Sequence, residues 1–172
     1  CRMNNSIKPG QVWLDTEGKR IQAHGGSVIC VEDTFYWYGE NKENTTGQDK
    51  TWHPGVRCYS SKDLYNWKDE GIIIPPNLED ETSPLHPTSM MDRPHIVYNK
   101  MTQKYVAWLK IMNEPPCFTV LTADHILGPY KLKNARVNPC GMAVGDFDIA
   151  VEPVDNKAYL ISERPHITLY VA

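Results

Sequence analysis

The chain has 172 residues, with 18 Lys or Arg against 21 Asp or Glu, and a net charge of −3 at pH 7. This length is typical of one domain, and the lack of a basic excess argues against a nucleic-acid partner. Without a long apolar stretch or a signal-peptide apolar region ahead of the first strand, we expect no membrane partner. The many Tyr, Trp, Pro and Gly residues suit an all-β chain and a carbohydrate binder.

The first expected unit covers about residues 22–76. Its first half, "GSVICVEDTFYWYGE", reads as two strands joined by a turn at Glu32-Asp33. Its second half, "GVRCYSSKDLYNWKDEG", reads as a strand, a polar turn that contains Asp63, and Trp67 as an aromatic plug.

The second expected unit, at about 90–134, repeats this plan. "RPHIVYNKMTQKYVAWLK" gives two strands with a turn at Asn99–Gln103, and "FTVLTADHILGPYKL" supplies the second half. A third unit begins at about 144–172 with "DFDIAVEPVDNKAYLIS", whose turn lies at Pro153–Lys157. Helical periodicity is nearly absent throughout.

The three units share one spacing. His24 and Tyr36, Arg93 and Tyr105, and Phe147 and Tyr159 are each 12 positions apart. Repeated four-stranded meanders of this kind indicate a β-propeller, and the alternative is a single β-sandwich with coincidental similarity. A propeller needs about four blades to close, and this chain supplies about two and a half. The chain is therefore expected to be a fragment that lacks the C-terminal blades. The alternative is a propeller that closes by association.

The repeat places an acidic residue at the start of two inner strands. The position before each anchor holds Ala23, Asp92 and Asp146. The first strand of each blade lines the central channel, so Asp92 and Asp146 are expected to face each other at one mouth. Strand alternation would point Asp92 and Arg93 in opposite directions. Carboxylates gathered there form a plausible acid/base site, although a lone Asp before a strand is usually a turn residue.

Other polar residues admit two interpretations each. Glu40 in "YGEN" is either a solvated strand end or a ligand contact, and Glu163 with His166 in "SERPH" is either a second polar cluster or an ordinary loop. His24, His95 and His166 suggest a metal site, but structural histidines are commoner, so we expect neither a metal nor another cofactor. The residues Trp52, Trp67 and Trp108 could stack on sugar faces, although blade plugs are more frequent.

The five cysteines cannot all pair, and they include no C-x-x-C motif. We therefore expect reduced thiols and a cytoplasmic location. The alternative is a secreted or periplasmic protein, including a lipoprotein that begins at Cys1.

Four segments together resemble glycoside hydrolase family 43, with the exo-β-1,3-galactanase branch as the nearest match. They are "WLDTEGKRIQAHGGSVICVEDTFYWYGENKE", "VRCYSSKDLYNWKDEG", "MDRPHIVYN…KYVAWLK" and "GDFDIAV…NKAYLISE". The resemblance implies a five-bladed β-propeller with a sugar pocket at the channel mouth. It also implies inverting hydrolysis by an acid and a base about 6.5–9.5 Å apart.

The resemblance also implies roles for single residues. Asp92 matches the acidic residue of this branch at its catalytic centre, and Arg93 matches the adjacent sugar-binding Arg. Asp146 matches the Asp that orients the acid, and Glu40 matches a substrate-contacting acid. We assign the catalytic group to Asp92 and Asp146, and substrate binding to the residues Glu40, Arg93, His24, Glu163 and His166.

The resemblance leaves the enzyme incomplete. The place of the usual base is held by His24-Gly25-Gly26, with no carboxylate. The galactanase-like branch also departs from the family pattern there, and the general acid of the family belongs to a fourth blade. We expect a parent glycosidase that acts on β-galactan or a related oligo- or polysaccharide, and an inactive isolated chain. The alternatives are a non-catalytic carbohydrate-binding propeller, which the missing base favours, and a protein-binding scaffold, which predicts exposed apolar residues around the mouth.

Overall fold

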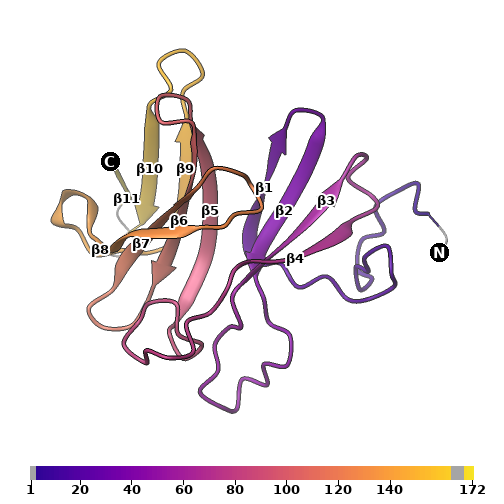
Figure 1. The fold of residues 1–172 in the computed structure, drawn as a ribbon, viewed down its shortest axis with the longest axis horizontal. Coiled ribbons are helices and arrows are strands. Elements are labelled where there is room, and N and C mark those ends of the chain that lie inside the picture. Colours follow the sequence, from indigo (N-terminus) through magenta and orange to yellow (C-terminus); the bar gives the residue numbers. More distant parts are fainter. Residues whose placement is uncertain (1–2, 164–168) are drawn as a thin grey trace.

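The computed structural model describes residues 3–163 and 169–172, and its strands form three antiparallel sheets (Figure 1). The first sheet runs in chain order through β1 (His24–Val31), β2 (Thr34–Glu40), β3 (Val56–Ser61) and β4 (Lys68–Ile74). The second sheet repeats this order with β5 (Met91–Asn99), β6 (Lys104–Ile111), β7 (Cys117–Ala123) and β8 (Lys131–Val137). After a 3-10 turn (Pro139–Gly141), the third contains β9 (Phe147–Val151), β10 (Ala158–Glu163) and β11 (Leu169–Val171).

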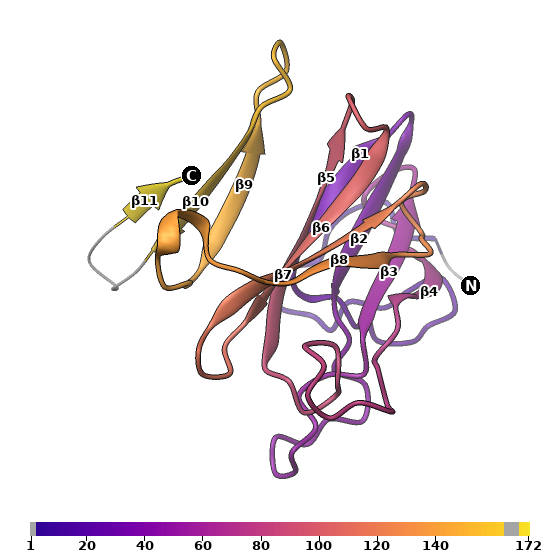
Figure 2. The same cartoon turned by 60° about the vertical axis from the view of Figure 1, so that its left-hand side comes forward.

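The first strands of the three sheets lie next to one another. β5 contacts both β1 and β9, and the later strands of each sheet lead away from this centre (Figures 1 and 2). This radial arrangement is that of a partial β-propeller, which confirms the expected all-β fold class. The sandwich alternative is wrong, because the three sheets radiate from a common centre, where their first strands lie side by side, instead of stacking as two layers.

The hairpin turns lie where the turn residues predicted them. Glu32 and Asp33 separate the paired residues Val31 and Thr34, and Glu32 adopts a left-handed φ of 55°. In the second hairpin the Asn99 side chain accepts a hydrogen bond from the Met101 N–H at 3.0 Å, which closes an Asx-type turn. The local turn chemistry therefore fixes where each inner strand ends.

The core lies between the sheets. One buried cluster joins the first and second sheets through residues such as Val56, Ile74, Met91 and Leu109. Tyr38 links the same two sheets, since its hydroxyl accepts the Ile96 N–H at 2.8 Å, and burial raises its pKa to about 12. A smaller cluster, Phe118, Val144, Phe147 and Leu160, joins the second and third sheets. These clusters hold the inner strands in fixed relative positions.

Two further features bear on the surroundings of the protein. No helix among residues 3–163 and 169–172 is long and apolar enough to cross a bilayer. The four cysteines of the described chain, Cys30, Cys58, Cys117 and Cys140, are free.

Candidate functional site

The inner strands of the first two sheets begin with the same irregularity. In β1 a bulge follows His24, and in β5 an equivalent bulge follows Asp92. His24 pairs with Glu40 on β2, and Asp92 pairs with Lys110 on β6. The two bulges therefore place an acid or a base from each strand at the same end of the inner strands.

This pairing corrects the alignment expected from the aromatic spacing. The counterpart of Asp92 in the first sheet is His24 and not Ala23. The reason is the turn length, because two residues separate Val31 from Thr34 whereas four separate Asn99 from Lys104. The constant 12-residue spacing therefore conceals a shift of one position between the two hairpins.

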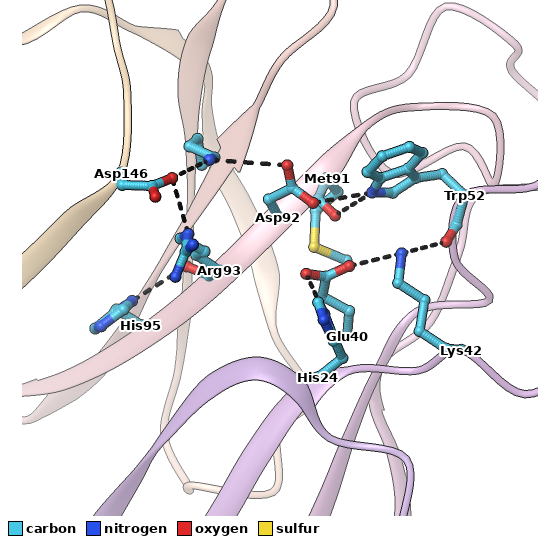
Figure 3. A network of polar contacts seen from close by, with 10 residues as sticks. His24, Glu40, Lys42, Trp52, Met91, Asp92, Arg93, His95 and Asp146 are labelled. Atoms are coloured by element: carbon cyan, nitrogen blue, oxygen red, sulfur yellow. Dashed lines mark hydrogen bonds and ion pairs between the residues drawn. The ribbon is translucent and has the colours of Figure 1, made fainter. Parts of the chain in front are cut away.

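Asp92 lies between two groups that sequence analysis did not assign to it. Its Oδ1 accepts the indole N–H of Trp52 at 3.0 Å, and the same N–H contacts the Met91 carbonyl at 3.0 Å. Its Oδ2 lies 3.8 Å from Nζ of Lys110 (Figure 3). Trp52 belongs to the connection between β2 and β3, so the first sheet anchors a carboxylate of the second.

Asp146 enters the same network from the third sheet. Its Oδ1 accepts hydrogen bonds from Nζ of Lys110 at 2.7 Å and from Nε of Arg93 at 2.9 Å (Figure 3). The Lys110 ammonium, supported by Arg93, lowers the pKa of Asp146 below its usual range. The expected proximity of Asp92 and Asp146 is present, because both carboxylates approach the same lysine.

The backbone at Arg93 departs from regular alternation. Its φ of 48° is left-handed, a region that costs a non-glycine residue roughly 1–2 kcal/mol. The bulge interrupts the expected alternation of Asp92 and Arg93, and both side chains join one polar network (Figure 3).

Glu40 forms the first-sheet part of the network. It is 1% exposed, and its Oε1 lies 3.3 Å from Nδ1 of His24 while Oε2 lies 2.8 Å from Nζ of Lys42. Burial raises the pKa of Glu40, and the ion pair with Lys42 opposes that rise. Nζ of Lys42 also donates to the Trp52 carbonyl at 2.6 Å and lies 4.5 Å from the centre of the Trp52 ring. Glu40 is thus a buried acid that contacts the Lys42 ammonium and the His24 ring, and not a solvated strand end.

The remaining candidate residues have different positions. Glu163 donates its backbone N–H to the Asp146 carbonyl at 3.0 Å, which places the end of β10 beside Asp146. His166 lies outside the described residues. His95 contacts Asp148 at 3.2 Å and packs on the Phe147 ring at 4.8 Å. Within the part of the chain that the structure describes, no group of three or more His, Cys, Asp and Glu residues is arranged to hold a metal ion.

Two residues of the network, Lys42 and Lys110, were not among the predicted candidates, and Trp52 was expected only as a sugar-stacking ring or a blade plug. A lysine on a strand usually reads as a solvated group, and the reach of Trp52 depends on how its loop folds. The segment "AWLKIM" did contain a signal for Lys110, since a lysine between apolar neighbours must find a buried partner.

Searches of protein-family models and of curated proteins find no match to this chain. Solved structures do match it over most of its length. One is a family 43 β-1,3-galactosidase with a TM-score of 0.82 and 32% identity, which covers 98% of this chain and 36% of the other. Another is an exo-β-1,3-galactanase from Phanerochaete chrysosporium with bound galactose, with a TM-score of 0.82, 30% identity, and coverage of 92% and 36%.

An exo-β-1,3-galactanase from Clostridium thermocellum also matches, with a TM-score of 0.80 and 27% identity over 96% of this chain and 37% of that one. The resemblance of this chain to glycoside hydrolase family 43 is therefore confirmed, with β-1,3-galactanases among its structural relatives. The chain spans little more than a third of the length of these proteins.

Proposed function

We propose that this chain contributes the sugar-binding part of the active site of a glycoside hydrolase that acts on β-1,3-linked galactose. The observation that carries the proposal is the convergence of Glu40, Asp92 and Asp146 with Arg93 at one end of the inner strands. Carboxylates and a guanidinium suit sugar hydroxyls, because charge-assisted hydrogen bonds are strong and directional. Structural relatives with galactose or β-1,3-galactotriose in their sites support a saccharide ligand.

The electrostatics suggest a role for each acid in inverting hydrolysis. Such a reaction needs one carboxylic acid to protonate the leaving oxygen and a second group to activate water. Lys110 and Arg93 favour the ionised form of Asp146, so this residue serves as a hydrogen-bond acceptor that orients another group and does not supply the proton. Asp92 positions the sugar or the water. The general acid and the base then come from parts of the protein beyond these residues.

A second candidate is a carbohydrate-binding propeller without hydrolytic activity. It is favoured by His24, which stands where family 43 usually carries its base. The two proposals share the sugar site and differ in turnover. We expect the isolated chain to release no product from aryl β-galactosides, whereas the intact parent protein hydrolyses β-1,3-galactan. A parent protein that binds galactan and never cleaves it would favour the second candidate.

The binding proposal is tested on the chain itself by titration with β-1,3-galactobiose, followed by amide NMR shifts. We expect saturable shifts around Asp92 and Asp146, and their loss in Asp92→Asn, which keeps the shape and removes the charge. Lys62→Ala is the matched control, because Lys62 is 66% exposed and pairs with Asp33 on a distant turn. An equal loss in both variants would contradict the site. In the parent protein, Asp92→Asn should reduce turnover far more than substrate binding.

A further inference from the structure

Lys110 occupies an unusual environment for a lysine. The residue is only 5% exposed and lies on β6 between the apolar residues Leu109 and Ile111, both of which are buried. An ammonium group out of water is costly unless it is paired. Its partners come from two other strand starts, since Nζ lies 2.7 Å from Asp146 and 3.8 Å from Asp92. Lys110 is therefore the cation shared by the acids of the second and third sheets.

Within the described residues, the side-chain hydrogen bonds to each of the two acids fall on its Oδ1 atom. Oδ1 of Asp146 accepts hydrogen bonds from Lys110 and Arg93, and Oδ1 of Asp92 accepts a hydrogen bond from the indole N–H of Trp52. The separation of 3.8 Å between Nζ of Lys110 and Oδ2 of Asp92 is attractive for charges but too long for a hydrogen bond. The second oxygens of the two acids are thus oriented by anchored partners and can accept further donors.

We propose that Lys110 is a positioning residue that holds Asp92 and Asp146 side by side, so that their Oδ2 atoms accept two hydroxyl groups of one sugar ring. This inference rests on the proposed function, because it concerns the same sugar site. It adds the device that sets the spacing between the two acids. A neutral side chain at position 110 would leave Asp146 with Arg93 alone and Asp92 with Trp52 alone.

The test compares three variants of the 172-residue chain. Lys110→Met removes the charge and keeps an apolar chain of similar length, Lys110→Arg keeps the charge, and Lys62→Met is the control for the loss of an exposed lysine. The first measurement is the carboxyl carbon chemical shift of Asp146 against pH. We expect its midpoint to rise in Lys110→Met, to stay low in Lys110→Arg, and to be unchanged in Lys62→Met.

The second measurement is the dissociation constant for β-1,3-galactobiose at pH 7 and pH 5. We expect Lys110→Met to weaken binding on the order of tenfold at pH 7, which is the size of one charge-assisted hydrogen bond. The loss should persist at pH 5, because even an Asp with the ordinary pKa of about 3.9 stays ionised at that pH. Lys110→Arg should recover most of the affinity, which a merely structural role would not explain.

Two negative results have different meanings. If the unmodified chain does not bind galactobiose, the proposed function fails for this chain, while the Asp146 midpoints still report on Lys110. If the chain binds galactobiose but Lys110→Met changes neither the midpoint nor the affinity, the positioning role is wrong and the proposed function stands. Lys110→Arg also guards against a misfolded Met variant, because an Arg variant with the Asp146 midpoint of a free carboxyl would overturn the inference on its own.

Discussion

The first and second sheets begin their inner strands with the same bulge and use it differently. In β1 the residue after His24 is Gly25, with a φ of 62°, and in β5 the residue after Asp92 is Arg93, with a φ of 48°. Glycine adopts this left-handed conformation at little cost, whereas arginine does not. The backbone geometry is thus shared, and only the second sheet places a charged side chain on it.

The difference shows where this propeller accepts backbone strain. Among the described residues, Arg93 is the one non-glycine residue inside a strand with a left-handed φ, and its guanidinium reaches Asp146. In the first sheet an added Cβ at Gly25 would lie 2.9 Å from Oε1 of Glu40, so a side chain there would displace the Glu40 carboxylate. One bulge makes space for a buried acid, and the other directs a cation at an acid of the next sheet.

The largest effect is expected when the first bulge is filled. A Cβ added at Gly26 would lie 1.8 Å from the Tyr38 carbonyl oxygen and 2.7 Å from the Gly39 Cα, both of which are backbone atoms. Because the backbone of the paired strand cannot yield as a side chain would, Gly26→Ala should lower the free energy of unfolding by about 3 kcal/mol or more. Urea denaturation measures this loss.

The control for that variant is Gly18→Ala. Gly18, unlike Gly26, has a left-handed φ, of 83°, and an added Cβ there meets nothing within 4 Å. It should cost only about 1 kcal/mol, from the conformational strain alone. Equal losses in the two variants would mean that the close approach at the first bulge contributes nothing.

The anchoring of Asp92 from the first sheet gives the next effect. Trp52→Phe keeps an aromatic ring and removes the N–H that donates to Asp92 and to the Met91 carbonyl. Since Trp52 is 38% exposed, the substitution should lower the free energy of unfolding by about 1 kcal/mol. Amide shifts should change at residues 91–95 of the second bulge more than at residues 24–27 of the first. The reverse pattern would contradict the assigned anchor.

Sequence alone predicted the hairpins well because turn residues act locally. Glu32-Asp33 and Asn99–Gln103 mark chain reversals through their own backbone and side-chain preferences, and the structure has its turns there. The proximity of Asp92 and Asp146 followed from the repeat. The bulges and the one-position shift to His24 did not, because they depend on how two strands pair.

The lysines of the site were harder to predict than its acids. Lys110 becomes an internal group only when β6 packs between two other sheets, and no local preference of "AWLKIM" specifies its partners. Lys42 and Trp52 meet through a connection whose path is set by tertiary contacts. Residue types therefore identified the acids, whereas the groups that tune them required the assembled fold.

A smaller effect on stability is expected at Arg93. Arg93→Gly relieves a left-handed backbone strain of roughly 1 kcal/mol. It also removes a half-exposed ion pair and adds chain entropy to the unfolded state, and together these two losses are of similar size to the gain. The free energy of unfolding should change by less than about 0.5 kcal/mol, while galactobiose binding weakens. Calorimetric titration alongside urea denaturation tests this separation, and a strongly destabilised Arg93→Gly chain would show that the strain estimate is wrong.

The subtlest contrast is the pH dependence of the two anchored acids. Asp146 has a lowered pKa in the folded state, so its stabilising contribution is present above the ordinary Asp value of about 3.9 and is lost as pH falls through the lowered pKa. Glu40 has a raised pKa because it is buried, so its effect has the opposite sign. Its protonated form favours folding below the ordinary Glu value of about 4.3, and that contribution is lost as pH rises through the raised pKa.

Urea denaturation between pH 3 and pH 7 distinguishes the two acids. The stability advantage of the unmodified chain over Asp146→Asn should grow as pH rises, and its advantage over Glu40→Gln should shrink. Glu79→Gln, on an exposed loop, provides the baseline. Parallel curves for the two site variants would mean that the ion pair with Lys42 outweighs the effect of burial on Glu40. Lys42 would then favour the ionised form of Glu40, as Lys110 and Arg93 favour that of Asp146. The first bulge would then be an ion-paired site of the same kind as the second, and the contrast between them would reduce to backbone strain.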